Sequence, residues 1–346
     1  MANIKDVAKK AGVSITTVSR VINKIEPVNS ETRLTVERAM EKLQYVPNQL
    51  ARGMRTKRTH TIGIIIPEFI NSFYHELFQC IEEQADSMGY TVLVCSTREK
   101  VNQDIKQIKT LISRRIDGIF LCTYGADKEM LAYLEKVGED IPVIFLDNLG
   151  NGYRVDTVYT DGFTAMEDMV FHLNHLGHTN IGFIKGLGQY PVANDRFAGF
   201  KSGLEKKGLV LNNRNIFEGD YSLQSGYRAG EHFMERGKDR PTAIIASSDL
   251  MAIGAMNCLM SKGVRIPQDM ALAGYDDISL AGLVAPSLTT TAQPIREIAK
   301  QAVGIMVNKS VNGIKDMKNV VLKGKLKVRH STDPNKPYIL PLTKTR

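Results

Sequence analysis

From residue 61 onward, short runs of apolar residues alternate with longer stretches in which apolar residues recur at helical spacing. Strand-like runs separated by helical patterns are typical of parallel sheets that are covered by helices on both faces. The series occurs twice, so we expect two α/β lobes. The predicted strands are 61–66, 91–95, 118–122, 143–146, 180–185, 242–246 and 270–274, and the predicted helices lie near 74–88, 102–115, 163–176, 193–207 and 222–236.

The first 45 residues have a different pattern, which predicts helices alone. Asn3 is a suitable N-cap, with an acid three positions later, for a helix that starts at Ile4. Gly12 can supply a sharp turn after this helix. Ser14 is then expected to cap a second helix over 15–23.

A third helix, over about 30–43, is expected to close a small core with the first two. The side chains predicted to fill this core are all apolar: Val7, Ala8, Val13, Val18, Val21, Ile22, Val36, Met40 and Leu43. Two short helices joined by a tight turn predict a helix-turn-helix unit, in which the second helix is free to enter the major groove of DNA.

The second helix is predicted to keep five residues outward: Ile15, Thr16, Thr17, Ser19 and Arg20. Arg20 suits a bidentate contact with guanine O6 and N7, and Ile15 and Thr16 suit a thymine methyl group or a neighbouring base edge. Three further residues are placed where a phosphate could be gripped: Asn29, Thr32 and Tyr45. An ordinary solvent-exposed helix face explains the same residues, and the local sequence leaves both interpretations open.

The charge distribution favours nucleic-acid binding by this N-terminal segment. The first 60 residues contain 12 Lys or Arg and five Asp or Glu, so they carry +7 of the chain's formal net charge of +8. A basic segment beside a neutral body is typical of a protein that neutralises phosphates. A solvated basic face is the alternative.

The cysteines and the N-terminus indicate a cytoplasmic protein. Cys80, Cys95, Cys122 and Cys258 lie far apart, and no secretory segment follows Met1. We therefore expect reduced thiols, as in a cytosol. No apolar run approaches the roughly 20 residues that span a bilayer, so we expect no membrane partner.

Polar and aromatic residues follow the predicted strands, and ligands of parallel sheets bind outside the carboxyl ends of strands. The residues in question are Asn71, Ser72, Phe73, Tyr74, Asp147, Arg196, Tyr221, Asp249 and Asp276. Carboxylates and Arg can chelate adjacent hydroxyl groups, and aromatic faces can cover the apolar side of a sugar ring. Ordinary surface charge is the alternative for each of them.

The whole chain resembles the lactose-repressor/galactose-repressor (LacI/GalR) family of bacterial transcription regulators. The strings that carry this resemblance are Ile4-Lys-Asp-Val-Ala8, Thr17-Val-Ser-Arg-Val-Ile-Asn23, Tyr45-Val-Pro-Asn48, Leu50-Ala-Arg-Gly-Met54 and Thr61-Ile-Gly-Ile-Ile-Ile-Pro67. Each string is moderately specific, but their order and spacing are very specific. The fold that the resemblance implies is a small all-α helix-turn-helix head followed by a periplasmic-binding-protein-like α/β body of two lobes.

For the head, the resemblance implies a hinge over 48–55 that becomes helical on DNA. A helix this short is marginal alone, and Gly53 weakens it further, so its folding is expected to depend on contact with DNA and a second subunit. Met54 occupies the position of an apolar minor-groove wedge that is usually Leu in relatives; linker filler is the alternative. The complete expected DNA-binding set is Ser14, Ile15, Thr16, Thr17, Ser19, Arg20, Asn23, Asn29, Thr32, Tyr45, Asn48, Leu50, Ala51, Met54 and Arg55.

For the body, the resemblance implies a pocket for a small effector, with Arg196 and Asp276 as its main polar contacts. The complete expected set is Phe73, Tyr74, Asp147, Tyr190, Arg196, Tyr221, Ser248, Asp249 and Asp276. Relatives that bind purines carry another cationic residue where this chain has Tyr190, which disfavours a purine. Relatives that use a phosphorylated carrier protein often lack the Arg and Asp pair and differ at Arg296. A neutral or mildly acidic sugar is therefore the first expectation.

The expected partners are operator DNA, a small-molecule effector and a second copy of the chain, with repression as the first expectation for the regulator. The expected domains are a head over 1–46, a hinge and linker over 47–60, a body over 61–332 and a tail over 333–346. Within the body, the N-lobe is expected to comprise 61–160 with 291–322, and the C-lobe 161–290 with 323–332.

Alternatives remain for the control and for the class of the protein. A phosphoprotein or another metabolite could act in place of a sugar. A two-lobed enzyme is disfavoured because Gly186-Leu-Gly188 lacks the third glycine of a dinucleotide fingerprint and Ser247, Ser248 and Asp249 lack a nucleophile elbow. A secreted solute-binding protein would need a signal peptide where this chain has a helix-turn-helix. His172, His175 and His178 fit a helix surface and end better than a metal site, so we expect neither a metal nor a cofactor.

Overall fold

The computed structural model describes residues 2–23, 27–45, 58–97, 101–123, 128–150, 152–314 and 316–336. The chain divides into two compact units, Met1–Thr59 and His60–Arg346, which we call the head and the body. The predicted hinge lies outside the described residues, and so do its expected DNA contacts Asn48, Leu50, Ala51, Met54 and Arg55.

The described part of the head contains three helices whose starts are set by local side-chain bonds: α1 (Ile4–Ala11), α2 (Ile15–Ile22) and α3 (Ser30–Lys42). The Asn3 side chain accepts from the Asp6 amide, and the Asp6 side chain accepts from the Asn3 amide at 2.9 Å, which forms a capping box. Gly12, with φ of 66°, makes the left-handed turn after α1, and the Ser14 hydroxyl caps α2. The predicted starts of α1 and α2 are therefore confirmed.

The head has its own small core. The fully buried side chains are those of Val7, Ala8, Val18, Val21, Val36 and Ala39. Of these, only Ala39 is absent from the predicted set. The other predicted core residues are partly buried against this cluster: Val13, Ile22, Met40 and Leu43.

The N-lobe of the body is a parallel sheet of six strands in the order β11-β5-β4-β3-β1-β2. These strands are β1 (Thr61–Ile66), β2 (Thr91–Ser96), β3 (Gly118–Leu121), β4 (Val143–Phe145), β5 (Asp156–Thr160) and β11 (Asn319–Leu322). Four helices cover the sheet: α5 (Ser72–Ser87), α6 (Val101–Ser113), α7 (Lys128–Gly138) and α12 (Ile295–Asn312). The core clusters place α5 and α12 on one face and α6 and α7 on the other.

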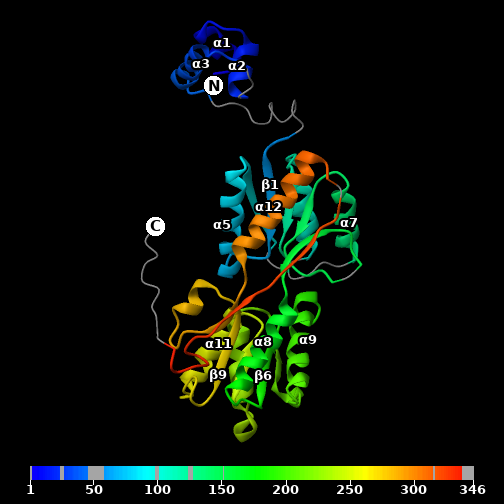
Figure 1. The fold of residues 1–346 in the computed structure, drawn as a ribbon, viewed down its shortest axis with the longest axis vertical. Coiled ribbons are helices and arrows are strands. Elements are labelled where there is room, and N and C mark those ends of the chain that lie inside the picture. Colours follow the sequence, from blue (N-terminus) through cyan, green and yellow to red (C-terminus); the bar gives the residue numbers. More distant parts are fainter. Residues whose placement is uncertain are drawn as a thin grey trace. The chain divides into compact units, whose positions relative to one another are not determined.

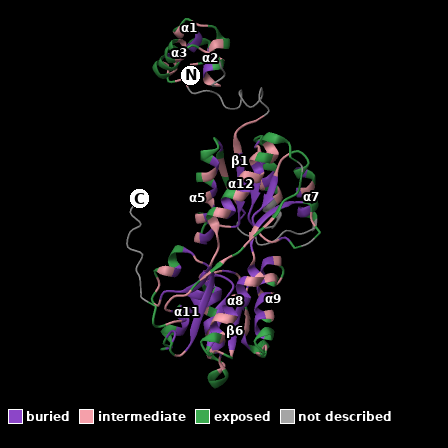
Figure 2. Ribbon diagram, viewed as in Figure 1, coloured by how far each residue is buried: buried purple, intermediate pink, exposed green. Residues whose placement is uncertain are grey.

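The C-lobe repeats this plan with the order β12-β10-β9-β8-β6-β7, and only β12 runs antiparallel to its neighbour. Its strands are β6 (Ile181–Lys185), β7 (Ile216–Glu218), β8 (Ala243–Ala246), β9 (Ala271–Asp276), β10 (Thr289–Ala292) and β12 (Lys325–Lys327). Its helices are α8 (Gly162–His175), α9 (Pro191–Lys206), α10 (Leu223–Met234) and α11 (Asp249–Ser261), with short 3-10 turns η1 (Asn213–Asn215), η2 (Gly237–Asp239) and η3 (Ser279–Gly282). Figures 1 and 2 show the two sheets as separate buried layers, each flanked by helices with exposed outer faces.

Three connecting segments join the lobes: from β5 into α8, from β10 into α12, and from β11 into β12. The first and third are tied together, because the Asp161 amide donates to the Leu322 carbonyl at 2.8 Å. Gly324, in the third connection, packs closely against the ends of β5 and β10. A Cβ at this position would lie 2.6 Å from Thr291 Cγ2 and 3.3 Å from Thr160 Cγ2. The crossings therefore form one closely packed hinge region between the lobes.

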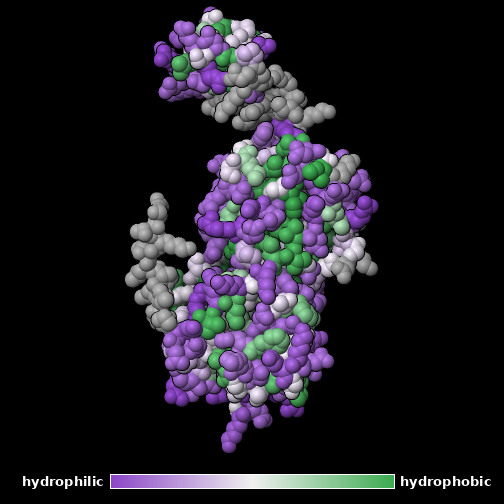
Figure 3. All heavy atoms as spheres, viewed as in Figure 1, coloured by the Kyte–Doolittle hydropathy of each residue, from purple (hydrophilic) through white to green (hydrophobic). Residues whose placement is uncertain are grey.

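The face of the body that Figure 3 shows is mostly polar, and apolar side chains gather on the N-lobe over and beside α12. Exposed apolar residues in this part of the chain include Val311, Met317 and Val321. Among the described helices, none is both long and apolar enough to cross a membrane. All four cysteines are free thiols.

Candidate DNA-binding helix and ligand cleft

The outward face of α2 presents Ile15, Thr16 and Arg20 to solvent. Thr17, Ser19 and Asn23 are half-buried, and their polar groups are used within the helix and its caps. The side-chain amide of Asn23 donates to the Ser19 carbonyl at 2.6 Å. Of the five residues predicted to face outward on α2, three are therefore exposed: Ile15, Thr16 and Arg20.

The predicted phosphate contacts lie around α3. Asn29 is exposed and uses its Oδ1 to accept from the Glu31 amide at 2.8 Å, so its Nδ2 donors are the atoms that a phosphate could reach. Thr32 is half-buried in the first turn of α3. Tyr45 is half-buried and packs against the core of the head.

Six of the nine predicted effector contacts line one cavity at the carboxyl ends of the strands: Phe73, Tyr74, Asp147, Arg196, Tyr221 and Asp276. The remaining lining residues are Asn71, Leu146, Tyr159, Thr160, Val192 and Gln293. Phe73, Tyr74 and Asp147 belong to the N-lobe, and Arg196 and Asp276 belong to the C-lobe. The cavity therefore lies between the lobes, and we call it the cleft.

Arg196 lies in the wall of the cleft and is only 7% exposed, and contacts on two sides hold its guanidinium in place. Its Nη1 donates to the Ser247 carbonyl at 2.6 Å, and its guanidinium carbon lies 3.9 Å from the centroid of the Tyr275 ring. Its Nε is buried without a hydrogen-bond partner. A buried donor without a partner is costly unless a ligand satisfies it, so this atom is suited to binding.

Asp276 ends strand β9 in a strained backbone conformation. Its φ is 122° and that of Asp277 is 58°, both in the left-handed region that favours glycine. Asp276 Oδ1 accepts from Gln293 Nε2 at 2.8 Å. Tyr221 also has a positive φ, of 68°, and a Cβ on Gly186 would lie 2.2 Å from its ring. Strain of this kind persists where the surrounding structure imposes it, and it is concentrated at binding sites.

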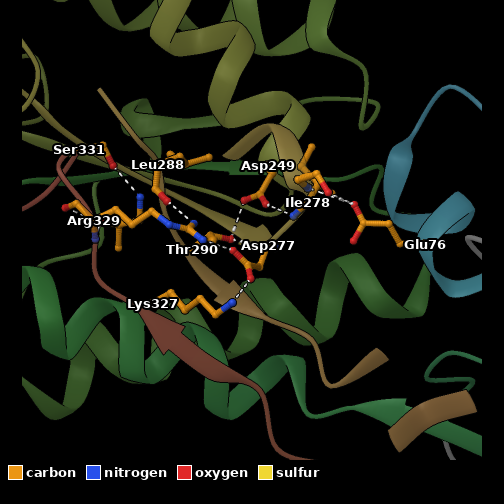
Figure 4. Close-up of polar contacts among 11 residues, drawn as sticks. Glu76, Asp249, Asp277, Ile278, Leu288, Thr290, Lys327, Arg329 and Ser331 are labelled. Atoms are coloured by element: carbon orange, nitrogen blue, oxygen red, sulfur yellow. Dashed lines mark hydrogen bonds and ion pairs between the residues drawn. The ribbon is translucent and has the colours of Figure 1, made fainter. Parts of the chain in front are cut away.

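A hydrogen-bond network holds the segment after β9 in place (Figure 4). Asp249 accepts from the Ile278 amide at 2.9 Å and from the Thr290 hydroxyl at 2.6 Å. Asp277 forms ion pairs with Lys327 and Arg329, and Arg329 also donates to the Leu288 carbonyl at 2.7 Å. The C-terminal segment thus fixes the loop that presents Asp276.

Three predicted effector contacts do not line the cleft. Ser248 is buried as the N-cap of α11, and Asp249 is buried in the hydrogen-bond network around the segment after β9. Tyr190 occupies the N-cap position of α9 and packs partly buried against the core of the body. Ser248 and Asp249 follow a strand as expected, but their side chains cap α11 and hold the segment after β9. The Tyr190 side chain makes no cap bond to α9.

The carboxyl groups of the cleft have altered acidity. Burial raises the pKa of Asp147 to about 6, although the charge of Arg196 opposes this shift. Burial also raises the pKa of Asp276, again against Arg196. The pKa of Asp249 is raised by burial and then by the charge of Asp276. The site therefore concentrates acidic groups around one buried cation.

The predicted histidine alternatives have structural partners. His172 Nε2 lies 2.9 Å from the Thr332 hydroxyl, and His178 Nδ1 lies 3.0 Å from the Thr242 hydroxyl. Within the described ranges, no group of His, Cys, Asp and Glu side chains is arranged to hold a metal ion. Arg296 is exposed on α12, where its Nη1 lies 3.3 Å from Glu83 Oε2.

A helix-turn-helix head and a two-lobed α/β body with a polar cleft define the class of ligand-responsive DNA-binding proteins. Residues 3–48 match the model of bacterial regulatory proteins of the lacI family. Residues 59–324 match the model of periplasmic binding proteins and the sugar binding domain of the LacI family. The chain belongs to the LacI family.

Curated relatives match nearly end to end. The chain is 35% identical to the HTH-type transcriptional regulator DegA of Bacillus subtilis (strain 168), over 96% of this chain and 98% of that protein. It is 33% identical to the HTH-type transcriptional repressor PurR of Aliivibrio salmonicida (strain LFI1238), over 89% and 92%, and 32% identical to catabolite control protein A of Priestia megaterium, over 95% and 98%. The chain is accordingly a DNA-binding transcription regulator and not an enzyme.

Solved structures extend this similarity to three dimensions. The lac repressor dimer bound to operator and the anti-inducer ONPF matches with a TM-score of 0.87 at 29% identity, over 96% of this chain and 99% of that chain. The complex of transcriptional regulator CelR with cellobiose matches with a TM-score of 0.73 at 27% identity, over 96% and 100%. The predicted fold class, a helix-turn-helix head with a two-lobed α/β body, is confirmed.

Proposed function

We propose that the chain represses transcription as a dimer on a palindromic operator, and that a carbohydrate bound in the cleft changes its affinity for DNA. The observation that carries the proposal is the buried Arg196, which has an unsatisfied Nε in the wall of a cleft between two lobes. The matched structures support it, because one is a repressor dimer on operator DNA and another holds cellobiose.

In this proposal Arg20, Ile15 and Thr16 read base edges from the exposed face of α2. Phosphates beside the major groove are contacted by Tyr45 and by the exposed Asn29, through its Nδ2 group. Two copies of the head then bind two half-sites, which is why a palindromic operator is expected. The predicted hinge residues Met54 and Leu50 belong to the same proposal as minor-groove contacts.

The effector is proposed to act by stabilising one arrangement of the lobes. Asp147 of the N-lobe and Arg196 of the C-lobe face the same cleft, so one ligand can contact both. Beside the cleft, Glu76 of α5 accepts from the Ser279 amide at 3.1 Å and from its hydroxyl at 2.8 Å, which bridges the lobes (Figure 4). A ligand that prefers one arrangement shifts the equilibrium by its difference in affinity.

Selection of DNA from a random pool tests the proposal for the head. The full chain should enrich a palindromic motif, and Arg20→Ala should retain weak binding while losing preference at one symmetric pair of positions, at roughly 10-fold or more per half-site. Arg236→Ala, in the C-lobe, is the matched control and should enrich the same motif as the parent chain. An unchanged motif with Arg20→Ala would refute the assigned reading helix.

A further inference from the structure

The charged groups of the cleft are unequal in number. Asp147 and Asp276 line it from opposite lobes, whereas Arg196 is the one cation among the described lining residues. Two more carboxylates lie near: the charge of Asp195 acts on Asp147, and both Asp195 and Asp161 act on Tyr159. With its acids ionised, the cleft is therefore a negatively charged site.

The hydrogen-bonding groups show the same imbalance toward acceptors. Gln293 uses its Nε2 to donate to Asp276, so its Oε1 is the atom left for a ligand. Among the described lining residues, Arg196 Nε, which is a donor, and Thr160 Oγ1, which can donate or accept, are buried without a hydrogen-bond partner. A ligand with many hydrogen-bond donors satisfies this wall best, because ionised carboxylates can only accept.

We propose that the cleft selects a polyhydroxylated ligand without negative charge, either a neutral sugar or an amine-bearing sugar, and excludes sugar phosphates and sugar acids. This inference rests on the proposed carbohydrate effector and narrows its class. Hydroxyl and ammonium groups donate to Asp147 and Asp276 while a hydroxyl oxygen accepts from Arg196 Nε. An added phosphate or carboxylate meets two carboxylates of like charge at close range, in a site that is shielded from water.

The titration of Asp147 supports the same conclusion. The groups that act on it are Arg196 and Asp195 of α9 and the Asn148 amide, and its pKa is raised to about 6 chiefly by burial. Above that pH the acid is ionised and repels anions, whereas below it the repulsion weakens. Exclusion of anionic sugars should therefore be strongest above neutral pH.

The test is a calorimetric titration of the full chain with matched sets of sugars at pH 8. Each set contains one neutral sugar with its amine, its phosphate and its acid, such as glucose, glucosamine, glucose 6-phosphate and glucuronate, and parallel sets start from other hexoses and disaccharides. In any set that binds, the neutral or amine member should bind at least 100-fold more tightly than the phosphate and the acid. An acid or phosphate that binds as tightly as its neutral parent overturns the selectivity and leaves the carbohydrate effector standing. A flat response to every set overturns both.

A variant tests the cause of the selectivity. Asp147→Asn keeps the shape and the bond from the Asn148 amide but removes one charge. It should bind the acid or phosphate member at least 10-fold more tightly than the parent chain does, with its thermal transition confirming that it is folded. Asp269→Asn is the matched control, because Asp269 bonds Arg265 at the protein surface away from the cleft. An Asp147→Asn variant that still rejects anions as strongly as the parent chain overturns the assignment of the charge.

Discussion

At the scale of single residues, the cleft depends on how Arg196 is held. Its Nη1 is fixed by the Ser247 carbonyl and its plane lies against Tyr275, so the guanidinium is ordered before a ligand arrives. Ordering of this kind reduces the entropy lost on binding. The charge of Arg196 acts on both carboxylates of the wall, Asp147 and Asp276, from this fixed position.

Arg196→Lys should weaken binding of the effector sugar by at least 10-fold, which corresponds to about 1.4 kcal/mol. Lysine keeps the charge but has no planar fork, so it cannot both reach the Ser247 carbonyl and lie against Tyr275. Calorimetric titration with a sugar that the matched sets show to bind measures the loss. Arg228→Lys, on the exposed part of α10, is the control and should bind as the parent chain does. Equal affinities for the parent and Arg196→Lys would show that the guanidinium geometry is not used.

Asp147→Asn should make the chain more stable at high pH. The pKa of Asp147 rises from 3.8 to about 6 on folding. Between these values the folded chain binds a proton that the unfolded chain has released, so stability falls as pH rises through this window and the loss is complete above it. The shift corresponds to about 3 kcal/mol. Asparagine does not titrate, so its advantage over the parent should be largest at pH 8 and absent near pH 4. Urea unfolding at both pH values tests this, and an advantage independent of pH would contradict it.

At the scale of elements, close contacts between helices hold the C-lobe. A Cβ on Gly226 would lie 2.1 Å from the Met251 carbonyl oxygen, and one on Gly254 would lie 2.0 Å from the Leu223 carbonyl oxygen. Helices α10 and α11 thus cross with their backbones nearly touching. A similar approach joins α8 and α9 at Gly199, where a Cβ would lie 2.1 Å from the Phe163 carbonyl oxygen.

Gly226→Ala should destabilise the body by at least about 2 kcal/mol, because the added methyl group forces α10 away from α11. Gly304→Ala on α12 is the matched control, since a Cβ there meets nothing within 4 Å. That change should stabilise the chain by up to about 1 kcal/mol through the better helix propensity of alanine. Thermal unfolding of both variants decides the matter. A loss of the same size in both would mean that the helix crossing is not the cause.

The strands that the sequence predicted are those with continuous apolar runs, such as Ile62 to Ile66 in β1. Five others were not predicted: β5, β7, β10, β11 and β12. They are short or rich in polar residues, as in Thr289-Thr-Thr-Ala292, and β11 pairs with β5 from a distant part of the chain. Such pairing depends on tertiary context, which a local pattern does not contain.

The same omission explains the missed residues of the cleft. Tyr159 and Thr160 end β5, and Gln293 follows β10. Prediction of these two strands would have placed all three at the carboxyl edge of a sheet. Conversely, Ser248 and Asp249 satisfy the strand-end rule but turn inward to cap α11 and bond Thr290. Position along the chain identified the edge of the sheet, whereas side-chain direction required coordinates.

At the scale of the whole molecule, the net positive charge and the cleft belong to different parts of the chain. The first 60 residues carry nearly all of the net positive charge, and the rest of the chain is close to neutral. Binding to DNA should therefore weaken steeply with salt. Binding of the proposed sugar would depend on buried groups such as Arg196 and should respond to salt much less. The crossings around Gly324 join the two lobes, so relative movement of the lobes must pass through this segment.

The central claim is that occupancy of the cleft controls the affinity of the head for DNA. The most direct measurement is the equilibrium affinity of the full chain for its selected DNA motif, with and without a saturating neutral or amine-bearing sugar that calorimetry has shown to bind. We predict a change of at least 10-fold in the parent chain, and a clearly smaller change in Arg196→Lys at the same sugar concentration, because less of the variant is occupied. If the sugar is bound and the affinity for DNA is the same with and without it, the claim is contradicted.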